Sequence, residues 1–131
     1  MDALVEVTRQ LQTPRRTPFA GERLARSQLE ALFVLAHRDT VTPSLLAATL
    51  RVTVGAVTQL VTGLRERDLV TQHPHPDDAR SVVLALTPQA VEEIGRFEVA
   101  FLDAVAPRFD ALPDDRIRDL AALLDAITEK P

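Results

Sequence analysis

Apolar residues recur at helical spacing over most of this chain. Where they fall three and four positions apart on one side of a helix, the pattern predicts an amphipathic helix. Such stripes predict four helices, over residues 1–12, from Ser27 to about residue 39, from 88 to 107, and from Pro113 onward. In the second of these, Ser27 and Glu30 have the spacing of a capping box, so we expect Ser27 to be its N-cap. Its inner face is expected to consist of Leu29, Leu32, Phe33 and Ala36.

Two shorter helices are predicted in the middle of the chain. Thr42 followed by Pro43 is typical of an N-cap and first helical position, and it opens a helix through Leu50. Thr53 can cap the next helix, which should end near Arg67. The buried side of this longer helix is expected to consist of Val57, Leu60, Val61 and Leu64.

After this helix the pattern changes to that of a β-hairpin. Residues 69–73 and 82–86 are short β-prone runs, and the proline- and aspartate-rich segment 74–79 between them favours a turn. A short helix, a tight turn, a longer helix and a hairpin, in this order, are typical of a winged helix-turn-helix. We therefore expect a mainly α fold with a small β-hairpin wing.

The terminal helices are too apolar on one side to stay in water alone. Burying them against a second copy of the chain is the simplest arrangement, and packing onto the chain's own lobe is the alternative. The predicted organisation is an N-terminal dimerisation helix and linker (1–26), a DNA-binding lobe (27–87) and C-terminal dimerisation helices (88–131).

Composition narrows the classes of function. The 131 residues are 46% hydrophobic and contain no cysteine, which excludes disulfides and thiolate chemistry. No apolar run approaches the ~20 residues of a membrane span and no secretory signal is visible, so a cytoplasmic protein without membrane contact is expected. The net charge of −4 argues against binding to nucleic acid. However, residues 87–131 carry ten acidic against five basic groups, whereas 41–86 are balanced, so the middle of the chain can approach an anion.

The outward face of the longer middle helix has the small polar side chains that suit the major groove. Gln59 can bond an adenine edge with two hydrogen bonds, and Thr58 can meet a phosphate or a thymine methyl group. Gly55 permits close approach of the backbone, and Thr53 with the helix N-terminus can hold a phosphate. An ordinary solvated surface is the alternative. The candidate contacts on this helix are Thr53, Val54, Gly55, Thr58, Gln59 and Thr62.

Arginines near this helix extend the predicted DNA-binding surface. Arg80 at the hairpin tip can enter the narrow minor groove, and Asp78 can orient its guanidinium by an ion pair. A surface salt bridge of little energetic consequence is the alternative. Arg51, in the turn between the two short helices, and Arg65 complete the set of candidate DNA contacts.

Metal and enzyme chemistry are not expected. His73, His75, Asp77 and Asp78 could attract a metal, but the prolines make this segment rigid and its acidic residues are equally explained by the turn. The chain has neither a nucleophile elbow nor a glycine-rich phosphate loop, so we expect no enzyme activity, no cofactor and no metal.

Three segments match one family of bacterial regulators. Residues 57–61, Leu69 with Val70, and 76–80 followed by Leu86-Thr87 resemble the helix and wing signatures of the MarR family. The resemblance implies a homodimer that reads a pseudo-palindromic operator on double-stranded DNA, and a repressor released by a small, often aromatic, ligand. Arg51 and Asp68 occupy positions where the family usually has glycine, and Ala79 replaces a common arginine.

Two questions stay open at this point. With few basic residues, a MarR-like dimer with weak or lost DNA binding that acts as a protein-interaction module is the alternative function. The ligand-binding residues are unknown, and the aromatic candidates are also candidates for the core: Phe19, Phe33, Phe97 and Phe101.

Overall fold

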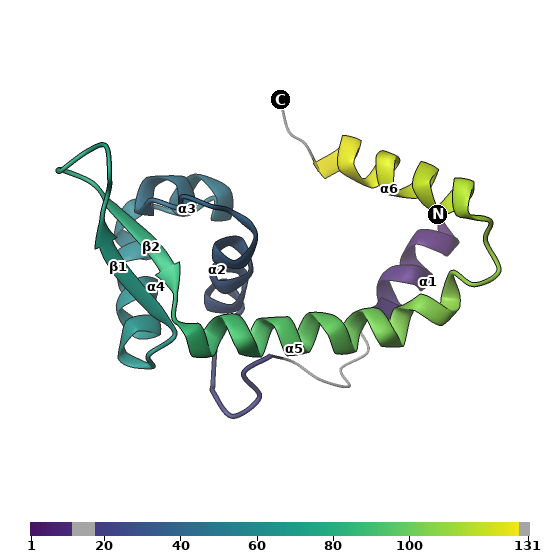
Figure 1. The fold of residues 1–131 in the computed structure, drawn as a ribbon, viewed down its shortest axis with the longest axis horizontal. Helices are drawn as coiled ribbons and strands as arrows, with labels where there is room; N and C mark the ends of the chain where they lie inside the picture. The colour runs from purple at the N-terminus through teal and green to yellow at the C-terminus, as the bar shows by residue number, and fades with distance from the viewer. Residues whose placement is uncertain (12–17, 129–131) are drawn as a thin grey trace. The chain divides into compact units, whose positions relative to one another are not determined.

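The computed structural model describes residues 1–11 and 18–128. Its elements are mostly helical, with one hairpin, as predicted (Figure 1). In chain order they are α1 (Asp2–Leu11), α2 (Arg26–His37), α3 (Pro43–Leu50), α4 (Val54–Glu66), β1 (Val70–Pro74), β2 (Val82–Leu86), α5 (Pro88–Val105), the 3-10 turn η1 (Ala106–Arg108) and α6 (Asp114–Thr128). No single helix in the described ranges is long and apolar enough to cross a membrane.

The chain forms two compact units. The terminal unit combines Met1–Thr13 with Glu98–Pro131, and the central unit is Pro14–Phe97. The predicted segments 1–26, 27–87 and 88–131 divide the chain differently. The reason is that Phe19, Ala90 and Ile94 are buried in the core of the central unit, which brings residues before α2 and the first half of α5 into it.

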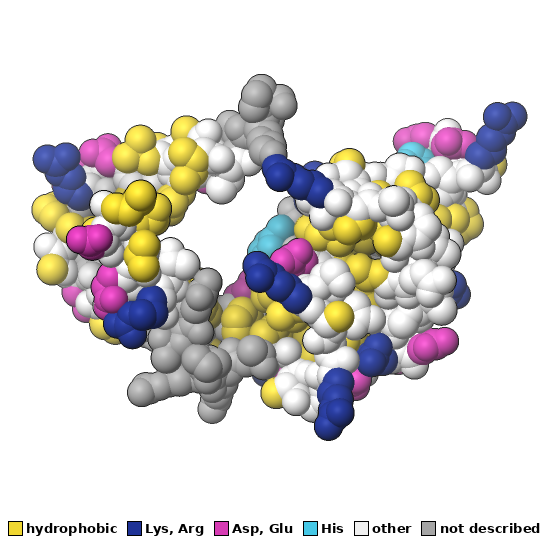
Figure 2. Space-filling model, turned by 180° about the vertical axis from the view of Figure 1, so that it is seen from behind, with side chains coloured by type: hydrophobic (Ala, Val, Ile, Leu, Met, Phe, Trp, Pro, Cys, Tyr) yellow, Lys and Arg dark blue, Asp and Glu magenta, His cyan; other side chains and the backbone are white. Residues whose placement is uncertain are grey.

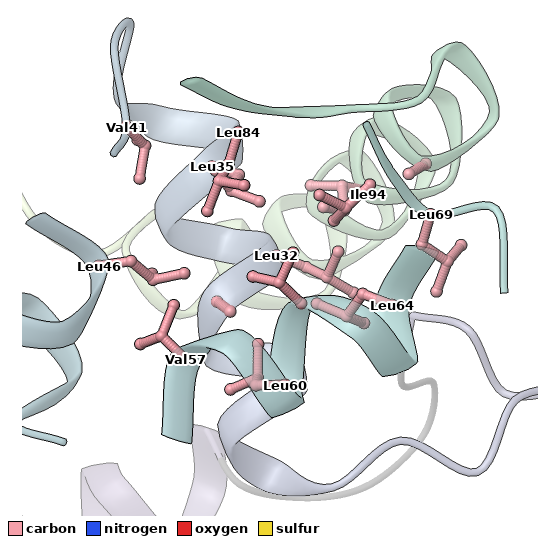
Figure 3. Packing of buried hydrophobic residues seen from close by; sticks show 14 of the residues in the cluster. Leu32, Leu35, Val41, Leu46, Val57, Leu60, Leu64, Leu69, Leu84 and Ile94 are labelled. Carbon is pink, nitrogen blue, oxygen red and sulfur yellow. The ribbon is translucent and has the colours of Figure 1, made fainter. Parts of the chain in front are cut away.

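The central unit has a continuous apolar core. Leu32 of α2, Leu46 of α3 and Leu64 of α4 are fully buried and point toward one another (Figure 3). The predicted buried stripe of α4 is confirmed: Val57, Leu60, Val61 and Leu64. Since burying one such side chain stabilises the fold by about 1.5–3 kcal/mol, this stripe firmly fixes which side of α4 faces outward.

Three threonines cap helices of the central unit, Thr42 and Thr53 as predicted and Thr87 in addition. The Oγ1 of Thr42 accepts a hydrogen bond from the Leu45 amide at 3.2 Å, and Thr53 accepts one from the Ala56 amide at 3.1 Å. Thr87 does the same at the start of α5 and is the one buried polar residue among those described. Each cap satisfies an amide that has no partner within the helix, which contributes about 1 kcal/mol.

The predicted start of α2 is wrong by two residues. Its N-cap is Ala25, whose amide donates to the side chain of Gln28 at 3.0 Å, and Ser27 lies inside the first turn. Glu30 instead pairs with Arg26 at 2.9 Å, one turn earlier. The inner face also shifts, because Leu35 is buried where Ala36 was predicted.

Both helices of the helix-turn-helix end in the same way. Arg51 after α3 and Asp68 after α4 have positive φ angles of 57° and 56°, in the left-handed region that favours glycine. In each case the next amide bonds back to the last turn, Val52 to the Ala47 carbonyl and Leu69 to the Leu64 carbonyl, both at 3.0 Å. These are Schellman motifs. The bend of 107° between α3 and α4 falls within the range typical of helix-turn-helix units.

The hairpin is antiparallel and is anchored at its base. Its register runs from Val70 opposite Leu86 to Pro74 opposite Val82, one residue beyond the predicted first strand. The Leu84 amide donates to the Val41 carbonyl at 2.8 Å, and both side chains are buried in the core. The free end of the hairpin is therefore carried by a fixed base.

The terminal unit lacks a comparable core. In α1, η1 and α6, no residue of the described chain is buried, and the two buried residues of α5, Ala90 and Ile94, belong to the central unit. Large hydrophobic side chains reach the surface along these helices (Figure 2). The most exposed of them are Leu4, Val5, Val99, Leu102, Leu123 and Ile127.

Candidate nucleic-acid interface

The outward face of α4 is exposed along its whole length. Thr53, Val54, Gly55, Thr58, Gln59 and Thr62 all lie in the solvent. The Thr58 hydroxyl donates to the Val54 carbonyl at 3.1 Å, and the Thr62 hydroxyl donates to the Thr58 carbonyl at 2.8 Å. Gln59 makes no side-chain hydrogen bond with any part of the chain that the structure describes. This amide is therefore available to a ligand, whereas the two hydroxyl protons are already used.

At the hairpin tip, Asp78 has a different role from the predicted one. Its Oδ1 accepts a hydrogen bond from the Arg80 backbone amide at 3.0 Å, and within the described ranges no ion pair joins it to the guanidinium. The predicted orienting ion pair is wrong, because the short side chain of Asp78 folds back onto its own turn. The Arg80 side chain is exposed, and charged and histidine side chains gather at this end of the hairpin (Figure 2).

The two histidines of the hairpin take part in local hydrogen bonds. The Nδ1 of His75 accepts from the Asp77 amide at 3.1 Å, and the His73 Nε2 lies 2.8 Å from the Thr71 hydroxyl. In the described residues, no three His, Asp or Glu side chains come together in a way that could hold a metal ion. The polar residues of this segment thus build the turn itself.

Arg51 and Arg65 lie at the two ends of the outward face of α4. The Arg65 guanidinium donates to Gln72 of β1 at 3.1 Å, which ties the last turn of α4 to the hairpin. Arg51 is exposed in the turn before Thr53. Gln72 was missed in the sequence, where the alternation along this strand gave no reason to single it out.

A shallow hollow separates α4 from β1. It has a volume of about 590 Å³, and its lining combines polar and apolar groups. Its walls are Thr62, Arg65, Glu66, Val70, Thr71, Gln72 and His73. Because Arg65 and Glu66 lie in the same hollow, it is not a uniformly positive surface.

A second set of contacts fixes the far end of α4. The Arg67 guanidinium donates to the Gly63 and Arg23 carbonyls, both at 3.3 Å, and lies 3.4 Å from Glu22. A Cβ at Gly63 would lie 2.9 Å from the Gln28 side chain, so this position needs glycine or a shift of Gln28. These residues hold α4 against the segment that leads into α2.

Phe19 and Glu93 link the same segment to α5. The Phe19 amide donates to the Glu93 carboxylate at 3.3 Å, and Arg96 contacts that carboxylate at 2.7 Å. The Arg96 side chain first, and the Phe19 amide second, lower the pKa of Glu93 below its ordinary value. Glu93 is thus held in its charged form.

Three of the four aromatic candidates belong to the packing of the central unit. Phe19 is buried, and the rings of Phe33 and Phe97 meet edge to face at 5.7 Å. Phe101 is partly exposed in the terminal unit. A separate apolar hollow of about 480 Å³ lies in that unit, lined by Leu102, Val105, Ala106, Phe109, Asp110, Leu112, Asp114 and Ile117.

Comparison with known proteins identifies the family. The model of the MarR family matches residues 24–81, the region from the start of α2 to the hairpin. An uncharacterized HTH-type transcriptional regulator of Mycobacterium leprae is 31% identical over 133 residues, covering 98% of this chain and 90% of that protein. The chain belongs to the MarR family. As a member of this family it is a transcription regulator of the winged-helix type.

Solved structures share the fold of this MarR-family chain. A single-substitution variant of MepR from S. aureus is similar with a TM-score of 0.82, 17% identity and coverage of 97% and 93% of the two chains. MepR bound to ethidium bromide gives 0.70, 18% identity and coverage of 97% and 92%. FabT of Streptococcus pneumoniae in complex with DNA gives 0.69, 21% identity and coverage of 97% and 91%. At these identities the likeness establishes the fold alone.

Proposed function

We propose that this MarR-family regulator is a repressor that binds a pseudo-palindromic operator as a homodimer. The observation that carries the proposal is the division of α4 into two sides. Its inner stripe is fully packed, while its outer face, from Val54 to Thr62, is exposed beside a hairpin with an arginine at its end. In a winged helix-turn-helix, such a face enters the major groove and such a hairpin lies over the backbone or the minor groove.

Each candidate residue has a role in this proposal. Gln59 reads a base edge, and Arg80 enters the minor groove. Arg51 and Arg65 contact phosphates on either side of the groove, and Thr53 with the first amides of α4 holds another phosphate. Asp78 acts indirectly, since it fixes the backbone of the turn that carries Arg80. FabT, which shares the fold, has been solved in complex with DNA, and this supports a DNA-binding role for the present chain.

The apolar surface of the terminal unit supports the homodimer. Leu4, Leu102, Leu123 and Ile127 of this unit are each more than 60% exposed, and a symmetric pair would bury such side chains against a twin. Two winged lobes related by a two-fold axis would place their recognition helices about 34 Å apart, one turn of DNA. The operator would then have two half-sites of opposite orientation.

Release by a small apolar or aromatic effector completes the proposal. The hollow of the terminal unit is mainly apolar and has the size of a small-molecule site. MepR, which shares the fold, has been solved with ethidium bromide, a planar aromatic cation. A compound that binds the terminal unit differently in two arrangements of the dimer would change the affinity for DNA.

The test is a binding titration at several salt concentrations. Fluorescence anisotropy compares a duplex from the region upstream of the protein's own gene with a scrambled duplex of the same composition. We expect tighter binding to the upstream duplex and a shallow loss of affinity between about 50 and 200 mM salt, since few arginines contact phosphate.

Equal affinity for the two duplexes, without dependence on salt, would contradict the proposal. It would favour the alternative of a dimer that has kept the fold and acts through protein partners. The low positive charge near α4 is the observation that favours this alternative. Sedimentation of the same samples distinguishes a folded dimer that ignores DNA from a protein that has not assembled.

A further inference from the structure

The outward face of α4 offers methyl groups rather than charges. None of the side chains between Val54 and Thr62 that face outward is charged, and the isopropyl group of Val54 is 50% exposed at the first turn. Arginine and lysine are the usual readers of guanine in the major groove. Because neither arginine nor lysine lies on this described face, the face has no usual hydrogen-bond donor for guanine.

The hydroxyl groups of the two threonines on this face are already used in hydrogen bonds within α4. Thr58 and Thr62 use their hydroxyl protons on the carbonyls one turn earlier, so neither can donate to a base without breaking a bond of 3.1 or 2.8 Å. Each side chain still carries a methyl group. Together with Val54, the threonines therefore form a row of apolar groups spaced one helical turn apart.

We propose that α4 recognises thymine by its 5-methyl group, with Val54 and Thr58 as the residues that contact it. Thymine is the base that presents a methyl group in the major groove, and valine and the threonine methyl are suited to meet it. Gln59, with its amide available, reads the adenine of an A·T pair. This inference rests on the proposed function and adds the chemistry that the half-site must present, a run of A·T base pairs under the first two turns of α4.

The spacing of these groups is compatible with two separate bases. Val54 and Thr58 are four residues apart, about 6 Å along the helix axis. Successive base pairs are about 3.4 Å apart, so the two methyl-bearing side chains can reach different base pairs. The expected pattern is two thymine contacts for each recognition helix.

The experiment removes the methyl group from the DNA and leaves the protein unchanged. The protein first selects its sequence from a pool of duplexes with a randomised centre. The selected duplex is then made again with single thymines replaced by uracil, which lacks the 5-methyl group and keeps the base pair. We expect about a fourfold loss of affinity at each contacted thymine, the equivalent of the ~0.8 kcal/mol gained by burying one methyl-sized group.

A matched pair of substitutions decides what Thr58 contributes. Thr58→Val keeps the methyl group and removes the hydroxyl, and we expect it to go on distinguishing the thymine duplex from the uracil duplex. Thr58→Ser keeps the hydroxyl and removes the methyl group from both half-sites, so we expect it to lose about sixteenfold in affinity, about fourfold for each half-site. It should also stop distinguishing thymine from uracil at the position that Thr58 contacts. If instead Thr58→Ser binds normally and Thr58→Val does not, the hydroxyl is the reading group and the inference is wrong.

Val54→Ala tests the second contact and Gln59→Ala the adenine contact. Val54→Ala should lose the response to uracil at one position, and Gln59→Ala should relax the preference at one base pair while keeping the response to uracil. A selected duplex whose affinity is indifferent to uracil would overturn the inference and leave the proposed function intact. If no sequence is selected and no duplex is bound, the proposed function fails and the inference fails with it.

Discussion

The central and terminal units contain similar proportions of leucine and valine but place these residues differently. All sixteen buried hydrophobic residues of the described chain lie in the central unit, between Phe19 and Ile94. In the terminal unit, residues of the same type are exposed, among them Leu102 at 62% and Leu123 at 65%. Amphipathic helices therefore do not by themselves show whether a segment completes its own core.

The difference indicates that the two units reach stability in different ways. The central unit holds its core within one chain, because α2, α3, α4 and the hairpin cover each other's apolar sides. The terminal unit exposes large hydrophobic side chains on each of its helices, so we expect its stability to depend on a second copy. Four changes test this contrast, and we give them from the largest expected effect to the smallest.

The largest effect is expected from Leu102→Asp in the second half of α5. If Leu102 is buried against a twin, the substitution acts twice in a symmetric dimer and should weaken association by more than about a hundredfold, since each buried leucine contributes about 1.5–3 kcal/mol. Val91→Asp, on the same helix but in the central unit and 57% exposed, is the matched control and should leave association unchanged. Sedimentation velocity measures both, and equal behaviour of the two variants would remove the contrast.

Leu64→Ala should destabilise the central unit itself. Leu64 is fully buried, so the cavity left behind should cost about 2–5 kcal/mol of unfolding free energy at any protein concentration. Leu123→Ala in the terminal unit should instead have an effect that grows as the protein is diluted, because the proposed homodimer would cover this leucine. Urea denaturation at two protein concentrations separates the two results, and a Leu123→Ala effect that ignores concentration would contradict the expectation.

Arg80→Ala should reduce affinity for the operator by about tenfold and flatten the salt dependence, since a charge is lost from each of two wings. Arg116→Ala is the control in the terminal unit. Arg116 is an exposed arginine whose nearest carboxylate, on Asp119, lies 3.8 Å away, and its loss should leave DNA binding unchanged. Anisotropy titrations on one operator measure both, and an Arg80→Ala protein with normal affinity would remove the wing from the interface.

The smallest effect concerns the link between Glu93 and its two partners. Because the folded pKa of Glu93 lies below its ordinary value of 4.5, its contribution to stability is present above that value and is lost as the pH falls through the folded pKa. Glu93→Gln should therefore be less stable than the unchanged protein near about pH 6, and the two should converge as the pH falls below 4.5 and through the folded pKa of Glu93. Thermal melts across this range test it, and a gap that does not change with pH would show that Glu93 does not act through its charge.

Much of the central unit could be predicted because its signals are local and agree with one another. Thr42, Thr53 and Thr87 each precede an apolar stripe or a proline, so cap and helix point to the same boundary. The predicted buried stripe of α4 also identified its outward face, because the residues on the opposite side of the helix must face the solvent. That this face is exposed is confirmed, while its contacts with DNA stay a prediction.

Other features of the structure left no clear signal in the sequence. Ser27 with Glu30 and Ala25 with Gln28 have the same capping spacing, and only the structure shows that Gln28 is the residue that accepts the hydrogen bond of the N-cap amide. Phe19 at a φ of 59° is buried because it packs into the core, although nothing in its neighbours predicts a left-handed residue. Asp78 has a backbone partner within its own turn, and this partner depends on a conformation that the sequence pattern does not specify.

The two left-handed helix ends have a consequence for the way this protein meets its target. Arg51 and Asp68 fix the backbone on both sides of α4, so the direction of this proposed recognition helix is set by backbone geometry and hydrogen bonds before any ligand binds. A rigid reading element loses little conformational entropy on docking and leaves the heat capacity change of binding to surface burial alone. Calorimetry on the assembled complex should accordingly show no signature of a helix that folds on contact.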